Sequence, residues 1–206
     1  MAAHLKRCRG TMARPYAIAA IGQAILAVLE AAVPPEFSGA DFQLYNAPNF
    51  QKPMDEGISL YLYRVVPANN IRNLPPRVAI DGRRYRPSLP IDFQFLMIAW
   101  ARNAFKQQRL LGWAMRVMED NSILHASLLN KYGPESDTFD DRECVDVIME
   151  SLSIQDLHSI WDVTKPNIQP AAAYIVRMLR IDTALEIGEA DLVQTRVIGA
   201  GKVVEA

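Results

Sequence analysis

Histidine and cysteine supply most nucleophilic and zinc-binding chemistry in proteins, and this chain has few of either. Its histidines are His4, His125 and His158; no two of them are close in the sequence, and only His4 has a cysteine, Cys8, within ten residues. Zinc sites and Cys–His catalytic pairs need such groups at usable spacings. We therefore predict no zinc site and no Cys–His catalysis. A hydrolase or transferase with an unrecognised nucleophile, Cys144 or His158, stays open as an alternative.

Two further patterns come close to ligand-binding motifs without completing them. The Gly-Ala-Gly-Lys run at 199–202 resembles a phosphate-binding loop, but that motif requires glycine where Arg196 stands and serine or threonine where Val203 stands. The second pattern is a group of three aspartates in one loop, Asp137, Asp140 and Asp141. The group lacks the spacing, the central glycine and the terminal glutamate of a calcium loop. No catalytic, cofactor-binding or metal-binding residue is predicted.

A basic and aromatic face on the predicted helix 103–119 is the most informative polar feature. Its members follow one another at spacings of three, four and three, so they share one side of the helix. They are Lys106, Arg109, Trp113 and Arg116. Tryptophan and arginine are enriched where proteins bind one another. We expect this face to contact a protein partner; the alternative is that Trp113 packs on a neighbouring loop of the same chain.

Hydrophobic periodicity predicts the elements that carry these residues. Helices are expected at 16–33, between prolines, at 103–119, from the spacing of its apolar residues, and at 154–163, between a Ser153 cap and Pro166. Strands are expected at 42–45, 58–66, 91–100, 174–181 and 192–198, and 144–149 is a further apolar run of unassigned structure. The strand 58–66 is apolar on both faces, which predicts an interior strand. Asp81-Gly82 should form the turn of a hairpin, and 130–143 should be a polar loop.

The composition of the chain limits its class. Its 206 residues are 50% hydrophobic and 22% charged, which favours one globular domain, and the net charge of −1 argues against nucleic-acid binding. Two cysteines are too few for a disulfide framework, so we expect assembly in the cytoplasm. The apolar segment 16–33 follows basic residues as a membrane anchor would, but Gly22, Gln23 and Glu30 interrupt it. We interpret it as a core helix, and a membrane-associated adaptor remains the alternative.

Four segments in this order resemble the cap, or tail-terminator, family of phage-tail-like contractile injection systems of the antifeeding-prophage type. The first is a Leu-Tyr-Arg-Val strand with an Asn-rich exit, followed by a second strand, a Leu-Gly-Trp-Ala-Met-Arg helix and a late strand. They occupy 57–73, 89–99, 110–121 and 152–182. The resemblance covers residues 16–182, and four ordered segments are more specific than any one of them.

The resemblance implies a structural protein without catalytic residues. It implies a homohexameric ring, stacked on the last layer of the tube and sheath at the end distal to the baseplate, with the inner tube protein and the sheath protein as partners. The expected fold is α+β, a mixed and largely antiparallel β-sheet flanked by helices, as in tail terminators. The expected organisation is an N-terminal extension (1–15), the terminator-like domain (16–182) and a C-terminal arm (183–206).

A closed ring requires two different complementary patches on each protomer. We expect the helix face described above to be one of them. The second is the proline- and asparagine-rich loop 67–76. Its candidate contact residues are Asn69, Asn70, Arg72 and Asn73. The arm could add a strand to the sheet edge of a neighbouring protomer.

Overall fold

The computed structural model describes residues 13–68, 74–79, 81–133, 135, 138–164 and 169–188. The helices are α1 (Ala17–Ala32), α2 (Ala104–Asp120), α3 (Ala126–Tyr132) and α4 (Ile154–Thr164), with short 3-10 turns η1 (Pro35–Phe37) and η2 (Ala47–Gln51). The strands are β1 (Asp41–Tyr45), β2 (Gly57–Pro67), β3 (Arg77–Val78), β4 (Arg84–Tyr85), β5 (Leu89–Trp100), β6 (Ile123–His125), β7 (Cys144–Glu150) and β8 (Ala171–Ile181).

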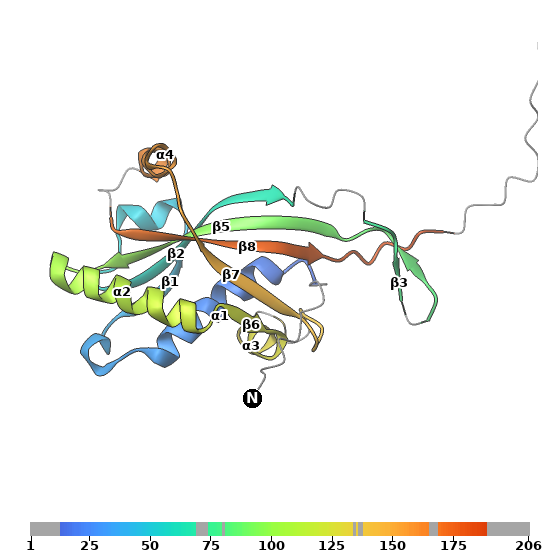
Figure 1. The fold of residues 1–206 in the computed structure, drawn as a ribbon, viewed down its shortest axis with the longest axis horizontal. Coiled ribbons are helices and arrows are strands. Elements are labelled where there is room, and N and C mark those ends of the chain that lie inside the picture. The colour runs from blue at the N-terminus through green and yellow to red at the C-terminus, as the bar shows by residue number, and fades with distance from the viewer. Residues whose placement is uncertain are drawn as a thin grey trace, which may run out of the picture.

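A six-stranded sheet in the order β1-β2-β5-β8-β7-β6 forms the frame of the molecule (Figure 1). Only β1 runs parallel to its neighbour β2, and every other pair is antiparallel. β3 and β4 make a separate hairpin. The predicted fold class, α+β with a mixed and largely antiparallel sheet, is therefore confirmed.

Three helices cover one face of this sheet and enclose the main core. The buried side of α1 is made of alanine, isoleucine and leucine, and it packs with α2 and α3 over the sheet. β5 supplies every second residue of its length to this core: Ile91, Phe93, Phe95, Met97 and Ala99. The alternation arises because successive side chains of a strand point to opposite faces.

The other face of the sheet is covered only toward one end. There η2 and α4 lie over a second cluster, in which Phe50 contacts the rings of Tyr45, Trp100 and Trp161. The indole of Trp100 donates a hydrogen bond to the buried Ser59 hydroxyl at 2.8 Å. On this side, β5 begins with polar residues and ends with apolar ones. The apolar residues Leu96, Ile98 and Trp100 are those that η2 and α4 cover.

A bulge bends β8 opposite the start of β5. The pairing shifts between Ile91 and Phe93, where β8 has one residue more than β5. Met178 takes a positive φ of 59°, which is uncommon for a residue with a side chain. The carboxylate of Asp92 accepts a hydrogen bond from the Met178 backbone N–H at 2.7 Å and holds this geometry.

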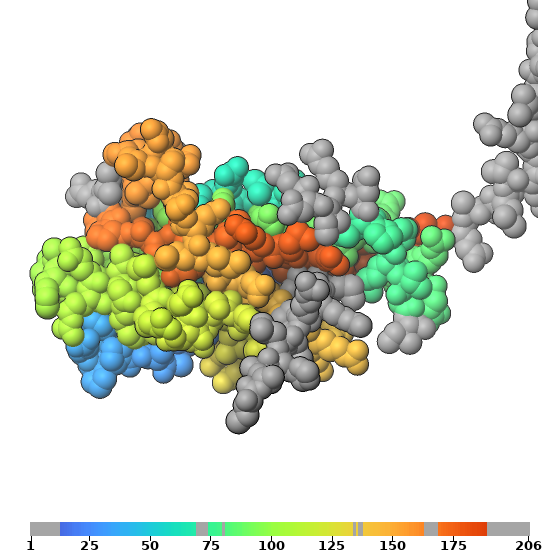
Figure 2. Space-filling view, viewed as in Figure 1, coloured from blue at the N-terminus to red at the C-terminus, as the bar shows by residue number. Residues whose placement is uncertain are grey.

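One end of the molecule projects beyond the sheet. The β3–β4 hairpin turns at Asp81 and Gly82, as predicted, with Gly82 at a φ of +85°. Residues after β8 run alongside it, and the Ile187 N–H donates to the Arg84 carbonyl at 2.8 Å. Figure 2 shows the hairpin, in green, at the right-hand end of the molecule.

Several expectations are corrected by the structure. β2 is buried on both faces only over its first four residues and is largely exposed from Leu62 onward, because the covering elements end there. The polar loop expected to begin at Asn130 begins after Tyr132, because α3 extends through it, and both α3 and β6 were missed. Ala13, just before α1, is fully buried and bridges to Ile181, while the division into extension, domain and arm stays a prediction. The predicted strand 192–198 lies outside the described residues.

Candidate functional site

The predicted contact face on α2 begins at a capped helix end. The side chain of Asn103 accepts a hydrogen bond from the Lys106 backbone N–H at 2.8 Å and so starts the helix. The Lys106 ammonium lies 2.6 Å from the carboxylate of Glu56, just before β2, and is about two-thirds buried. This lysine therefore links the helix to the sheet and offers little charge to a partner.

The two arginines of the face stay more exposed. Arg109 pairs with Glu36 of η1, and its guanidinium lies 5.6 Å from the ring centre of Phe105. Arg116 pairs with Asp120 one turn along the same helix. Such exposed pairs are weak in water, so a partner with a well-placed carboxylate could compete for either arginine.

Trp113 is half-buried against the segment that follows α1. Its ring centroid lies 6.0 Å from that of Phe37 in η1 and 6.2 Å from that of Phe42 in β1. One side of the indole therefore packs on a neighbouring segment of the same chain, as the alternative interpretation expected. A contact role for the face stays a prediction. Sequence reasoning missed Phe105, which is 72% exposed beside Arg109 and belongs to the same surface.

The second predicted contact region is only partly described. Asn69, Asn70, Arg72 and Asn73 lie outside the described residues. The hairpin that follows them is described, and Arg77 of β3 stacks 4.4 Å above the ring of Tyr85 in β4. Apolar side chains remain exposed at this end, with Val78 at 63% and Leu185 at 58%.

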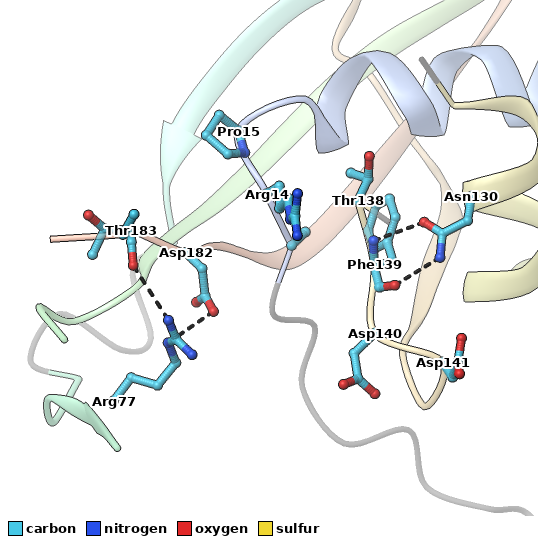
Figure 3. Close-up of a pocket in the computed structure, with 12 residues that line it drawn as sticks. Arg14, Pro15, Arg77, Asn130, Thr138, Phe139, Asp140, Asp141, Asp182 and Thr183 are labelled. Atoms are coloured by element: carbon cyan, nitrogen blue, oxygen red, sulfur yellow. Dashed lines mark hydrogen bonds and ion pairs between the residues drawn. The ribbon is translucent and has the colours of Figure 1, made fainter. Parts of the chain in front are cut away.

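A cavity of about 870 Å³ lies where three separate segments meet (Figure 3). Arg14 enters from before α1, Asp140 from the loop before β7, and Asp182 from after β8. Asp182 is held by Arg77 at 3.1 Å and by the Ser88 hydroxyl at 2.5 Å. Backbone hydrogen bonds from the Arg14 N–H to the Thr138 carbonyl at 2.9 Å and from the Asp182 N–H to the Ala13 carbonyl at 2.7 Å tie the three segments together. The described lining holds no pair of nucleophile and base.

Glu143, at the start of β7 next to this cavity, is an unusual buried carboxyl group. One oxygen accepts a hydrogen bond from the Asp140 N–H at 2.8 Å, and the other has no partner. Burial raises the pKa of Glu143 to about 8, with further contributions from the charges of Asp140 and Asp182. The group therefore changes charge near neutral pH, with consequences for stability.

The remaining candidates for chemistry are dispersed. His125 and His158 are both exposed, on β6 and α4, whereas Cys144 is buried in β7. Across the described ranges, no cluster of three or more His, Cys, Asp or Glu side chains could hold a metal ion. Among the same residues, no helix is both long enough and apolar enough to span a membrane.

The mixed, mostly antiparallel sheet and the helices that cover it make an α+β fold. A family model described as the Pvc16 N-terminal domain matches residues 20–195. The chain belongs to this family. The resemblance drawn from the four sequence segments is thereby confirmed, and the match extends past residue 182 into the predicted arm.

Solved structures show the same fold. One is the sheath/tube terminator of an extracellular contractile injection system, PVC, in the extended state, with a TM-score of 0.59 and 14% identity over 92% of this chain. Another is the tube-terminating cap of the anti-feeding prophage, with a TM-score of 0.53 and 14% identity over 89% of this chain. The chain spans 63% and 60% of the length of these two proteins. No curated protein matches the sequence.

Proposed function

We propose that this protein is the structural cap of a contractile injection system. It closes the tube and sheath at the end distal to the baseplate, without catalysing a reaction. The observation that carries the proposal is the family match over residues 20–195, supported by agreement of the fold with a sheath/tube terminator. The dispersed histidines and the internally paired charges of the described residues favour a structural role.

The cap acts as a homohexameric ring stacked on the last layer of the inner tube protein and the sheath protein. Identical protomers close a ring only if each presents two different surfaces that fit one another. The described residues offer two exposed apolar or mixed surfaces, at opposite ends of the molecule in Figure 1. One is the α2 surface with Phe105, Arg109 and Arg116, and the other is the β3–β4 hairpin. The ring assembles in the cytoplasm as part of the particle.

Reconstitution tests this function directly. The full chain is mixed with tube and sheath proteins from the same gene neighbourhood, and the products are examined by negative-stain electron microscopy. Tubes of bounded length with additional density at one end are expected. The matched control omits the chain, and its tubes should grow to variable lengths with open ends. Failure of the chain to associate with assembled tube or sheath would contradict the proposal.

A charge-reversal series then tests the α2 surface. Arg116→Glu places a negative charge on the exposed surface, and association with assembled tube should weaken by about tenfold or more if this surface docks there. Lys52→Glu, at the exposed end of η2 on the opposite face of the sheet, serves as the matched control for a loss of positive charge elsewhere. Equal behaviour of the two variants would remove α2 from the docking surface while leaving the cap function intact.

A further inference from the structure

The outer edge of the sheet is only partly paired. β1 accompanies β2 over Gly57–Tyr61 and stops at Tyr45. β2 then continues for six residues, 62–67, bonded to β5 on its inner side alone within the described part of the chain. An unpaired strand edge presents backbone donors and acceptors that another strand can satisfy. The edge of β2 beyond β1 is thus an open position for one more strand.

An apolar groove of about 410 Å³ lies beside this open edge. It is bounded by the first half of α1 on one side and by β1, β2 and β5 on the other, and its lining includes Tyr16, Ile18, Leu44, Leu62 and Phe93. Tyr16 is 51% exposed, Leu44 40% and Leu62 42%.

Val65 extends the apolar surface of this groove. It is 47% exposed and pairs directly with Phe93, a lining residue, so it faces the same side of the sheet. Four large apolar side chains left exposed at one strand edge indicate a surface that another segment covers.

The segment 192–198, predicted to be a strand, has the pattern that such a position requires. It lies outside the described residues. Its alternate residues Val193, Thr195 and Val197 are all β-branched, while Gln194 and Arg196 stand on the opposite face. An added edge strand buries one face and exposes the other, and β-branched side chains suit the buried face.

The groove of the same copy is out of reach of this segment. Ile181 pairs with Leu89, and the chain then continues along the hairpin to Gly188, away from the sheet (Figure 1). Seven extended residues carry it about 23 Å beyond the sheet. The four residue steps from Gly188 to Leu192 span at most ~14 Å, which does not lead back to the open edge of β2.

We propose that segment 192–198 of one copy adds as a strand along residues 62–67 of β2 in a second copy. Val193 and Val197 then cover the apolar groove, and main-chain hydrogen bonds complete the edge. The donor segment and the acceptor groove are different surfaces of the same chain, so the contact runs head to tail and can repeat from copy to copy until a ring closes. This contact requires neither tube nor sheath.

The test compares full-length variants by analytical ultracentrifugation. Leu62→Asp alters the groove at a half-exposed position, and Val197→Asp alters the donor segment. The matched controls are Ile154→Asp, which places the same charge on an exposed apolar residue of α4, and Arg196→Asp, which changes the opposite face of the donor. Circular dichroism checks that each variant is folded, and Val197→Asp keeps the test valid if Leu62→Asp fails to fold.

We expect the wild type and both controls to form oligomers, and each test variant to associate at least about tenfold more weakly. Mixing the two test variants should restore dimers but no larger species, because the intact groove of one meets the intact donor of the other. The proposal is overturned if the wild type is monomeric, or if the test variants assemble as well as their controls. Tube binding measured separately on the same variants tests the cap function, and its loss without a loss of oligomers would affect that function alone.

Discussion

The two ends of the molecule are built differently. At the covered end, α1 and α2 lie on one face of the sheet and η2 and α4 on the other, so β5 is buried on both sides over its last eight residues. At the projecting end, the β3–β4 hairpin and residues 183–188 hold each other through a few hydrogen bonds and leave Val78 and Leu185 exposed. The difference indicates that burial at the covered end stabilises the fold, whereas the projecting end leaves apolar side chains exposed.

The largest effect should come from the aromatic cluster at the covered end. Phe50→Ala removes a ring that is 4% exposed and contacts four other rings, so the free energy of unfolding should fall by about 3–5 kcal/mol. Val78→Ala, on the hairpin, should change it by less than ~0.5 kcal/mol. Chemical denaturation measures both, and similar losses would contradict the contrast between the ends.

A pH effect should come from Glu143, between the two ends. Its pKa is raised to about 8 from the ordinary 4.5, so the folded chain keeps a proton that the unfolded chain releases between these values. The contribution of Glu143 to the free energy of unfolding should therefore fall as the pH rises through this window and level off above it.

Glu143→Gln should abolish this slope and be the more stable protein at pH 9 by ~2–4 kcal/mol. Denaturation curves between pH 5 and 9 measure the effect. Glu30→Gln, an exposed change on α1, should keep the wild-type slope. Parallel curves for Glu143→Gln and the wild type would show that Glu143 is ionised throughout.

A smaller effect is expected from Trp113, where α2 meets the segment after α1. Trp113→Ala removes contacts with Phe37 and Phe42 from a half-buried position, so stability should fall by about 1–2 kcal/mol. Trp113→Phe should recover part of that loss. Thermal denaturation measures both variants. A neutral alanine variant that nonetheless lost tube binding would assign the indole to the interface alone.

The smallest global effect should come from the hairpin turn. Gly82→Ala forces a side chain into a φ of +85° and should strain the turn locally by about 1 kcal/mol. Hydrogen exchange at the Ala79 and Gly82 amides, which bond across this turn, should accelerate while global stability changes little. Gly39→Ala, where the added carbon meets no atom within 4 Å, is the control. Cooperative loss of global stability would show that the hairpin belongs to the core.

Local patterns predicted the elements that carry their own signals. The prolines around α1 and the Asp81-Gly82 turn each fix a boundary through nearby residues, and both lie where expected. The strand β1 was also predicted, but its parallel pairing with β2 depends on contacts between distant segments. α3 was missed because seven residues are too short for a clear helical period.

For the candidate site, the sequence could predict only the arrangement of residues within the single helix α2. The spacing of Lys106 and Trp113 predicted that they share one side of a helix, and both residues lie within α2. It could not show that Glu56 and Phe42 come back to meet them, since those residues lie far away in the sequence. The groove beside β2 had no sequence signal at all, because an open edge is a property of how strands end relative to one another.

The bulge at Met178 sets the direction in which the chain leaves the sheet toward the projecting end. A bulge bends its strand and increases the local twist, and everything after Met178, including the chain that accompanies the hairpin, follows that direction. The bend is locked by one hydrogen bond from the Met178 N–H to Asp92, inside the sheet. The Asp92 carboxylate thus helps to orient the hairpin end of the molecule, which lies several residues away. A substitution at Asp92 would change the orientation of that end without altering any of its own residues.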